Sequence, residues 1–188
     1  GVPQEVGPVH VVVHGAWITT DPEILDVSRD EYRRDNLDPL IAALRYAAMG
    51  APDAFVFLSS SGVFGPHDAS AGLTDTDEPT GVSPYAMLKR LGERHVLEGC
   101  GPTTAPHVVR LGYLFGPGEA ARPTRQRVSL VASWSAAARA GRPLEVRADD
   151  PVRDWTYVLD LAGALARVIA RFDGALERIV EAADASAD

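Results

Sequence analysis

The sequence lacks the features of a secreted or membrane protein. It contains one cysteine, Cys100, so no disulfide can form within the chain, and we expect a reducing compartment. No apolar run reaches the roughly 20 residues needed to cross a bilayer, and the N-terminus lacks the basic and then apolar order of a signal peptide. We therefore expect a cytoplasmic protein with no membrane partner.

Positive charge is also scarce. The 18 basic and 26 acidic residues give a net charge of −8, which argues against nonspecific nucleic-acid binding. Hydrophobic residues make up 46% of the 188 residues and charged residues 23%, as in ordinary soluble proteins. The length is sufficient to bury a substantial core.

Lysine is almost absent: Lys89 is the only one, and every other basic residue is arginine. Lysine provides a compact ammonium group without the planar fork of arginine. Tyr85 lies four residues earlier, so on a helix the phenol and the ammonium share one face. A neighbouring cation favours the phenolate, which predicts a tyrosine pKa lowered toward neutrality and a proton-transfer pair. The alternative is a packed tyrosine beside a solvated lysine.

Three serines follow a short apolar segment. Residues 54–58 are typical of a buried strand, and they lead directly into Ser59, Ser60, Ser61 and Gly62. Open α/β sheets bind their ligands at the carboxyl ends of the strands, so these hydroxyl groups are candidate ligand contacts. The alternative is local bonding to their own backbone within a turn.

Four segments together resemble a known family. They are residues 59–65 (SSSGVFG), 83–89 (SPYAMLK), 110–118 (RLGYLFGPG) and 153–162 (RDWTYVLDLA). In this order they resemble the extended short-chain dehydrogenases/reductases, most closely the NAD-dependent epimerase/dehydratase type. The resemblance extends from about Val9 to about Phe172.

The resemblance implies an α/β fold, a partial Rossmann-like, doubly wound parallel sheet that begins at the family's fourth strand. Residues 1–118 would form the half of an NAD(P)-binding domain that carries the catalytic residues. Residues 119–188 would form part of a substrate-binding lobe, interleaved with the last strands. The patterns predict strands at 9–13, 54–58, 107–111, 144–147 and 178–180, and helices at 28–49, 85–98, 129–140 and 161–172.

A strand leading into Gly-x-x-Gly-x-x-Gly is missing from the sequence. In the family this turn binds the cofactor pyrophosphate. The residue that would choose between NAD and NADP is missing as well, and we favour NAD. We therefore interpret the chain as a fragment, and we expect the strand at 9–13 to have an unpaired edge.

The resemblance also implies roles for individual residues. Tyr85 would act as the base, Lys89 would hold the phenolate and the cofactor ribose, and Ser60, favoured over Ser61 by register, would bond the substrate oxygen. Asn36 matches an asparagine that takes part in a water relay, with a polar surface residue as the alternative. The implied cofactor contacts are Gly15, Ala16, Leu58, Ser59, Tyr85, Lys89, Leu111 and Tyr113, and the implied substrate contacts are Ser60, Ser61, Gly62, Tyr113 and Arg153.

Two departures from the family narrow the chemistry. Dehydratases of this type carry Asp-Glu where this chain has Ser61 and Gly62, which disfavours dehydration. Nucleotide-sugar epimerases often carry asparagine where this chain has Tyr113, which weakens a nucleotide-sugar assignment. Seven arginines against four acids between Glu119 and Arg153 suit a small anionic or sugar-like substrate, the alternative being a solvated surface.

Two hypotheses follow. The first is an NAD(P)-dependent oxidoreductase or epimerase that transfers hydride at a sugar-like secondary alcohol, with epimerase and dehydrogenase both left open. The second is an inactive fragment or a non-catalytic binding module on the same scaffold. Family members commonly form homodimers through the helices that match 28–49 and 85–98, and we expect the same here.

Overall fold

The computed structural model describes residues 9–65, 72–74, 76–146 and 154–173. Its centre is a parallel sheet of β1 (Val11–His14), β2 (Ala54–Ser60) and β3 (Ala105–Leu111), in that order. These strands arise from the apolar, β-branched segments that the sequence predicted. Within the described residues β1 pairs only with β2, so the predicted open edge is present.

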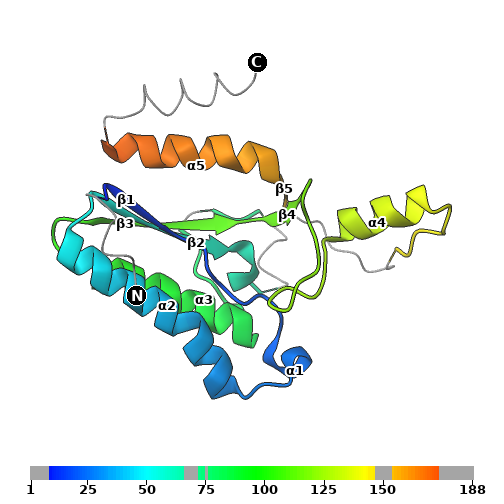
Figure 1. Ribbon diagram of the computed structural model, residues 1–188, viewed down its shortest axis with the longest axis horizontal. Helices are drawn as coiled ribbons and strands as arrows, with labels where there is room; N and C mark the ends of the chain where they lie inside the picture. Colours follow the sequence, from blue (N-terminus) through cyan, green and yellow to red (C-terminus); the bar gives the residue numbers. More distant parts are fainter. Residues whose placement is uncertain (1–8, 66–71, 75, 147–153, 174–188) are drawn as a thin grey trace.

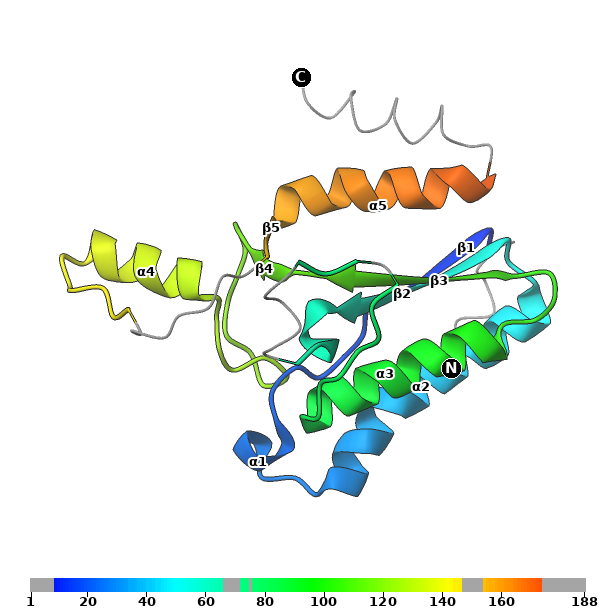
Figure 2. The same cartoon turned by 180° about the vertical axis from the view of Figure 1, so that it is seen from behind.

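Helices cover both faces of this sheet. Helices α2 (Arg29–Gly50) and α3 (Pro84–Gly99) pack on one face, and α5 (Val158–Asp173) lies across the other (Figures 1 and 2). A short helix, α1 (Pro22–Leu25), precedes α2. The core lies between the sheet and the α2/α3 pair. Its fully buried side chains include Tyr32, Leu40, Phe55, Phe57 and Val96.

Serine caps fix where α2 and α3 begin. The Ser28 hydroxyl accepts a hydrogen bond from the Glu31 amide, and the Ser83 hydroxyl accepts one from the Ala86 amide. Pro84 occupies the first turn of α3, where its missing N–H costs nothing. The predicted helices at 28–49 and 85–98 are confirmed, and α3 therefore presents Tyr85 and Lys89 one turn apart.

A second sheet lies beside the carboxyl ends of the main strands (Figure 1). It consists of β4 (Tyr113–Phe115) and β5 (Trp155–Tyr157), which run parallel. The rings of Tyr113 and Trp155 lie in contact, 5.7 Å apart between centroids and tilted by 52°. Helix α4 (Leu130–Arg139) follows β4 and lies within the predicted range 129–140. The Ser129 hydroxyl caps it by accepting a hydrogen bond from the Ala132 amide.

Three local predictions need correction or lie outside the description. Residues Leu144–Val146 form no strand, because the Glu145 carbonyl bonds the Trp134 indole instead of a neighbouring strand. Helix α5 begins at Val158 rather than at 161, because β5 leads directly into it. The strand at 178–180 lies outside the described residues. The division of the chain at residue 118 stays a prediction. No helix within the described ranges has the length and apolar character of a membrane span.

Candidate active site

Lys89 lies under the carboxyl end of β2. Its side chain is 3% exposed, and its ammonium donates a hydrogen bond of 2.7 Å to the Leu58 carbonyl oxygen. The ammonium also lies over the rings of Trp17 and Phe57, at 4.3 and 4.7 Å from their centroids. The sole lysine of the chain is therefore an internal group, and the solvated-lysine alternative is wrong.

Burial dominates the ionisation of Lys89. Desolvation lowers the pKa of this ammonium from 10.5 to about 7, and the negative charge of Glu93 partly opposes the effect. The lysine therefore titrates close to neutral pH, where a small change in its surroundings changes its charge.

Tyr85 is half-buried and lies next to Ser60. Burial raises the pKa of its phenol above the ordinary value of 10, while the Ser60 hydroxyl and the Arg125 charge act in the opposite direction. The prediction that Lys89 draws this pKa toward neutrality is therefore wrong for the protein alone, because desolvation outweighs the favourable neighbours.

The segment after β2 turns closely around Tyr85. The Ser60 hydroxyl accepts a hydrogen bond of 3.0 Å from the Gly62 amide and caps the short 3-10 helix η1 (Ser61–Val63). The alternative of local bonding within a turn thus holds for the Ser60 hydroxyl, which also contacts Tyr85. A Cβ at Gly62 would lie 3.3 Å from the Tyr85 ring and 3.2 Å from the Ser60 hydroxyl, so glycine permits this approach.

Ser59 points away from this turn. Its side chain is 3% exposed, and its hydroxyl donates to the Glu93 carboxylate at 2.5 Å. Arg110 on β3 binds the same carboxylate twice, at 3.1 Å from Nε and 2.8 Å from Nη2. The Ser59 side chain therefore belongs to a buried polar network.

Asn36 is fully buried, and its side-chain amide forms hydrogen bonds with the backbone. Its Oδ1 accepts a hydrogen bond of 2.7 Å from the Ile18 amide, and its Nδ2 donates to the Tyr32 carbonyl at 2.9 Å. The alternative of a polar surface residue is wrong. The side chain holds the segment that follows β1, and its place in a water relay stays a prediction.

A cavity of about 450 Å³ opens where β1 ends. The predicted cofactor residues Gly15 and Ala16 line it, and Arg125 closes the side toward the second sheet. Leu111, another predicted cofactor residue, ends β3 directly beside Ser60 in the strand register. The structure thus brings these positions to one edge of the sheet, where such folds bind ligands. The other lining residues are Trp17, Ile18, Thr19, Asp35, Pro39, Arg122 and Thr124.

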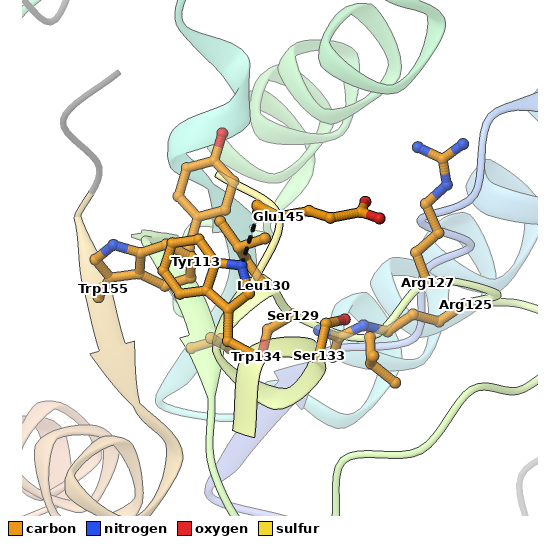
Figure 3. A pocket seen from close by; sticks show the side chains of 11 residues that line it. Tyr113, Arg125, Arg127, Ser129, Leu130, Ser133, Trp134, Glu145 and Trp155 are labelled. Atoms are coloured by element: carbon orange, nitrogen blue, oxygen red, sulfur yellow. Dashed lines mark hydrogen bonds between the residues drawn. The ribbon is translucent and has the colours of Figure 1, made fainter. Parts of the chain in front are cut away.

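A second cavity, of about 480 Å³, lies between the second sheet and α4. Figure 3 shows the rings of Tyr113, Trp134 and Trp155 on one side and Arg125 and Arg127 on the other. The cavity therefore combines flat apolar surfaces with two positive charges, and the Glu145 carboxylate lines it as well.

Arg125 borders both cavities. Glu119 fixes its guanidinium through a 2.8 Å ion pair and also accepts hydrogen bonds from Ser129. The Thr124 carbonyl next to it receives the Thr19 amide at 3.1 Å. Arg153, the arginine favoured from the sequence, lies outside the described residues.

Three contributors were missed by sequence reasoning. Glu93 continues the four-residue spacing of Tyr85 and Lys89, a signal that was available. Arg125 was one of several equivalent arginines, and nothing local distinguished it. Trp17 lines the cavity at the end of β1 and also packs against the core, and its sequence context does not distinguish the two roles.

Comparisons with known proteins agree with this arrangement. The model of the NAD dependent epimerase/dehydratase family matches residues 2–183. MoeE5, solved in complex with UDP-glucose and NAD, is 25% identical with a TM-score of 0.69, over 87% of this chain and 53% of its own. A search of curated protein sequences gave no match.

Two further solved structures share the fold. UDP-N-acetylglucosamine 4-epimerase from Methanobrevibacter ruminantium M1 is 22% identical, with a TM-score of 0.67, over 82% of this chain and 49% of its own. UDP-glucose 4-epimerase from Thermotoga maritima is 22% identical, with a TM-score of 0.66, over 84% and 51%. The chain spans about half the length of these structures, and they confirm the expected partial Rossmann-like fold. By its family match, the chain belongs to the NAD dependent epimerase/dehydratase family.

Proposed function

We propose that the protein acts as an NAD-dependent oxidoreductase or epimerase on a sugar-like secondary alcohol. The observation that carries the proposal is the convergence of Ser60, Tyr85 and Lys89 at the carboxyl end of β2. In this proposal Tyr85 takes the proton from the substrate hydroxyl, and Ser60 donates a hydrogen bond to the same oxygen.

The cavity at the end of β1 suits a dinucleotide. Gly15 and Ala16 border it, and the Lys89 ammonium lies directly over the ring of Trp17, which also lines it. Among the residues that the structure describes, the buried Trp17 indole N–H has no hydrogen-bond partner, so a polar group of a ligand would satisfy it. When bound, NAD would supply the hydride acceptor. The related MoeE5 was solved with NAD, which supports NAD without distinguishing it from NADP.

Positive charge would make the Tyr85 phenolate accessible. Because burial raises the pKa of this phenol, deprotonation near neutral pH needs a cation close by. Arg125 already acts in this direction, and protonated Lys89 one turn away would add to it. We therefore assign both side chains the role of stabilising the phenolate.

The second cavity suits an anionic substrate with a flat group. Arg125 and Arg127 would bind phosphate or carboxylate oxygens, and Trp134 or Trp155 would stack on a planar ring. UDP-glucose is bound in MoeE5, and a nucleotide sugar is the substrate class we favour. Tyr113, in place of the family's common asparagine, contributes to this cavity and leaves a smaller sugar acid as the alternative.

Titration of the chain with NADH tests the cofactor site. We expect NADH to quench the tryptophan fluorescence with micromolar affinity. Lys89→Ala should weaken binding at least tenfold, and Arg94→Ala, an exposed position on the same helix, should not. Circular dichroism would confirm that each variant is folded. Absence of binding to the wild-type chain would reject the proposal for this chain and leave a non-catalytic role.

We also propose a homodimer through α2 and α3. A groove of about 220 Å³ runs between these helices and includes Val82 and Met87, which are 82% and 58% exposed. Light scattering after size-exclusion chromatography would test the dimer. Met87→Asp should yield monomers, whereas Leu144→Asp, an exposed apolar residue elsewhere, should not. A wild-type monomer would reject the proposal.

A further inference from the structure

A buried carboxylate lies one helical turn beyond Lys89. Glu93 is 5% exposed, and other elements supply its three hydrogen bonds, one from Ser59 on β2 and two from Arg110 on β3. A buried ion pair contributes little net stability compared with apolar residues of the same size. Its presence here therefore calls for an explanation other than stability.

Glu93, the acidic member of the ion pair with Arg110, is one of the α3 residues that contact β2. Tyr85, Lys89 and Glu93 are each four residues apart and lie on one face of the helix. They meet three consecutive residues of β2, because Tyr85 lies at Ser60, Lys89 binds the Leu58 carbonyl, and Glu93 binds Ser59. Glu93 is thus part of the alignment that carries the proposed catalytic residues.

The surroundings of Lys89 contain few groups that favour its charge. Within the described part of the chain, the Leu58 carbonyl is its only hydrogen-bond acceptor. The rings of Trp17 and Phe57 exclude water from the ammonium and attract it through their faces. His14 faces it from β1, and Arg110 stands behind Glu93. Tyr85, whose pKa is raised by burial, carries no negative charge that would favour the Lys89 ammonium while its phenol is protonated. Glu93 is therefore the carboxylate that opposes the desolvation of this ammonium.

We propose that Glu93, held in place by Ser59 and Arg110, is a positioning residue that keeps Lys89 protonated beside Tyr85. The use of this charge in catalysis rests on the proposed function, whereas the coupling between Glu93 and Lys89 does not. Arg110 has a double effect. It orders the carboxylate, and its own positive charge acts against Lys89.

The single lysine of the chain makes a direct test practical. Protein labelled with ¹⁵N only in lysine gives one Nζ signal, from Lys89, and its chemical shift followed against pH gives the pKa of that group. We expect Glu93→Gln to lower this pKa by at least about one pH unit, because it removes the opposing charge and leaves Arg110. Arg110→Gln should raise it, because Ser59 still holds the carboxylate while the opposing positive charge of Arg110 is gone. Glu98→Gln, an exposed position on the same helix, should leave it unchanged.

The decisive result is a fall of the Lys89 pKa in Glu93→Gln together with a rise in Arg110→Gln. If the ion pair were purely structural, breaking it from either partner would shift this pKa in the same direction. An unchanged pKa in folded Glu93→Gln, or shifts of the same sign in both variants, would overturn the proposal. Should Glu93→Gln fail to fold by circular dichroism, the sign of the Arg110→Gln shift decides, and a fall or no change rejects the coupling. Opposite shifts together with no NADH binding by the wild-type chain would support the coupling and reject the proposed function.

Discussion

The ammonium of Lys89 donates a hydrogen bond of 2.7 Å to the carbonyl oxygen of Leu58. This contact ties the first half of α3 to the end of β2, and the next residues of that strand are Ser59 and Ser60. One bond thus relates the helix that carries Tyr85 to the strand end that carries the serines. The same hydrogen bond therefore positions Tyr85 relative to the serines and holds the Lys89 ammonium in a buried place.

The first prediction concerns stability and pH. The pKa of Lys89 is about 7 in the folded chain, against 10.5 for an exposed lysine. Between these values the unfolded chain binds more protons at this residue, so raising the pH stabilises the folded state. Urea denaturation at pH 7 and pH 9.5 should show the free energy of unfolding of the wild type rising, relative to Lys89→Met, by on the order of 2 kcal/mol.

Lys89→Met serves as the reference because methionine keeps the packing on Trp17 and Phe57 without a titrating group. The other ionisable residues are the same in both proteins, so their effects cancel in the difference. Free energies that change in parallel between the two pH values would show that Lys89 does not titrate as the structure implies.

The second prediction concerns the turn before α3. A Cβ at Gly81 would lie 2.6 Å from the Val63 carbonyl oxygen and 2.8 Å from the Ala86 Cβ, and the Gly81 amide already donates to that carbonyl at 2.8 Å. Gly81→Ala must therefore displace backbone, and we expect a loss of about 2 kcal/mol or more in the free energy of unfolding.

Gly101→Ala is the matched control, because within the described ranges no atom beyond its chain neighbours lies within 4 Å of a Cβ built there. It should change the urea midpoint little, or raise it slightly by restricting the unfolded chain. Equal midpoints for both variants would mean that the contact between the turn and η1 is not as close as described.

Short-range patterns explain why much of the fold could be predicted from the sequence. The strand before the serines and the helix that carries Tyr85 and Lys89 are encoded by apolar spacing, serine caps and a proline in the first turn. Parallel strands then bring their carboxyl ends to one edge, which places Ser60 beside Leu111, whereas the approach of Tyr85 also depends on how α3 packs on the sheet.

Long-range contacts explain what could not be predicted. The bond between Glu93 and Arg110 joins residues 17 apart in the sequence, and only the sheet register places them together. The pKa of the Tyr85 phenol depends on how far burial excludes water from it, and residue spacing in the sequence does not show this. Strands β4 and β5 have three residues each, too few to show an alternation of apolar and polar residues, and each pairs with the other.

The third prediction concerns Arg125. It borders both cavities and is fixed by Glu119, so its removal should weaken the binding of an anionic ligand. Isothermal titration with UDP-glucose should show at least a tenfold weaker affinity for Arg125→Met, the loss typical of a charge-assisted hydrogen bond. Arg139→Met, an exposed position at the end of α4, should bind like the wild type. Equal affinities for both variants would place the anion elsewhere.

The last prediction concerns Tyr85 itself. If its phenol takes the substrate proton, Tyr85→Phe should reduce turnover of UDP-glucose by about 100- to 10,000-fold, the usual contribution of a general base. The thermal unfolding midpoint should change little, because the phenyl ring keeps its contacts with the η1 turn. Tyr46→Phe, a partly exposed tyrosine on α2, should retain full turnover. Absorbance at 340 nm during the same assay separates the two reaction types, since a dehydrogenase accumulates NADH and an epimerase does not. Retained turnover in Tyr85→Phe would remove the phenol from the reaction and leave Lys89 or Arg125 to stabilise the substrate oxygen directly.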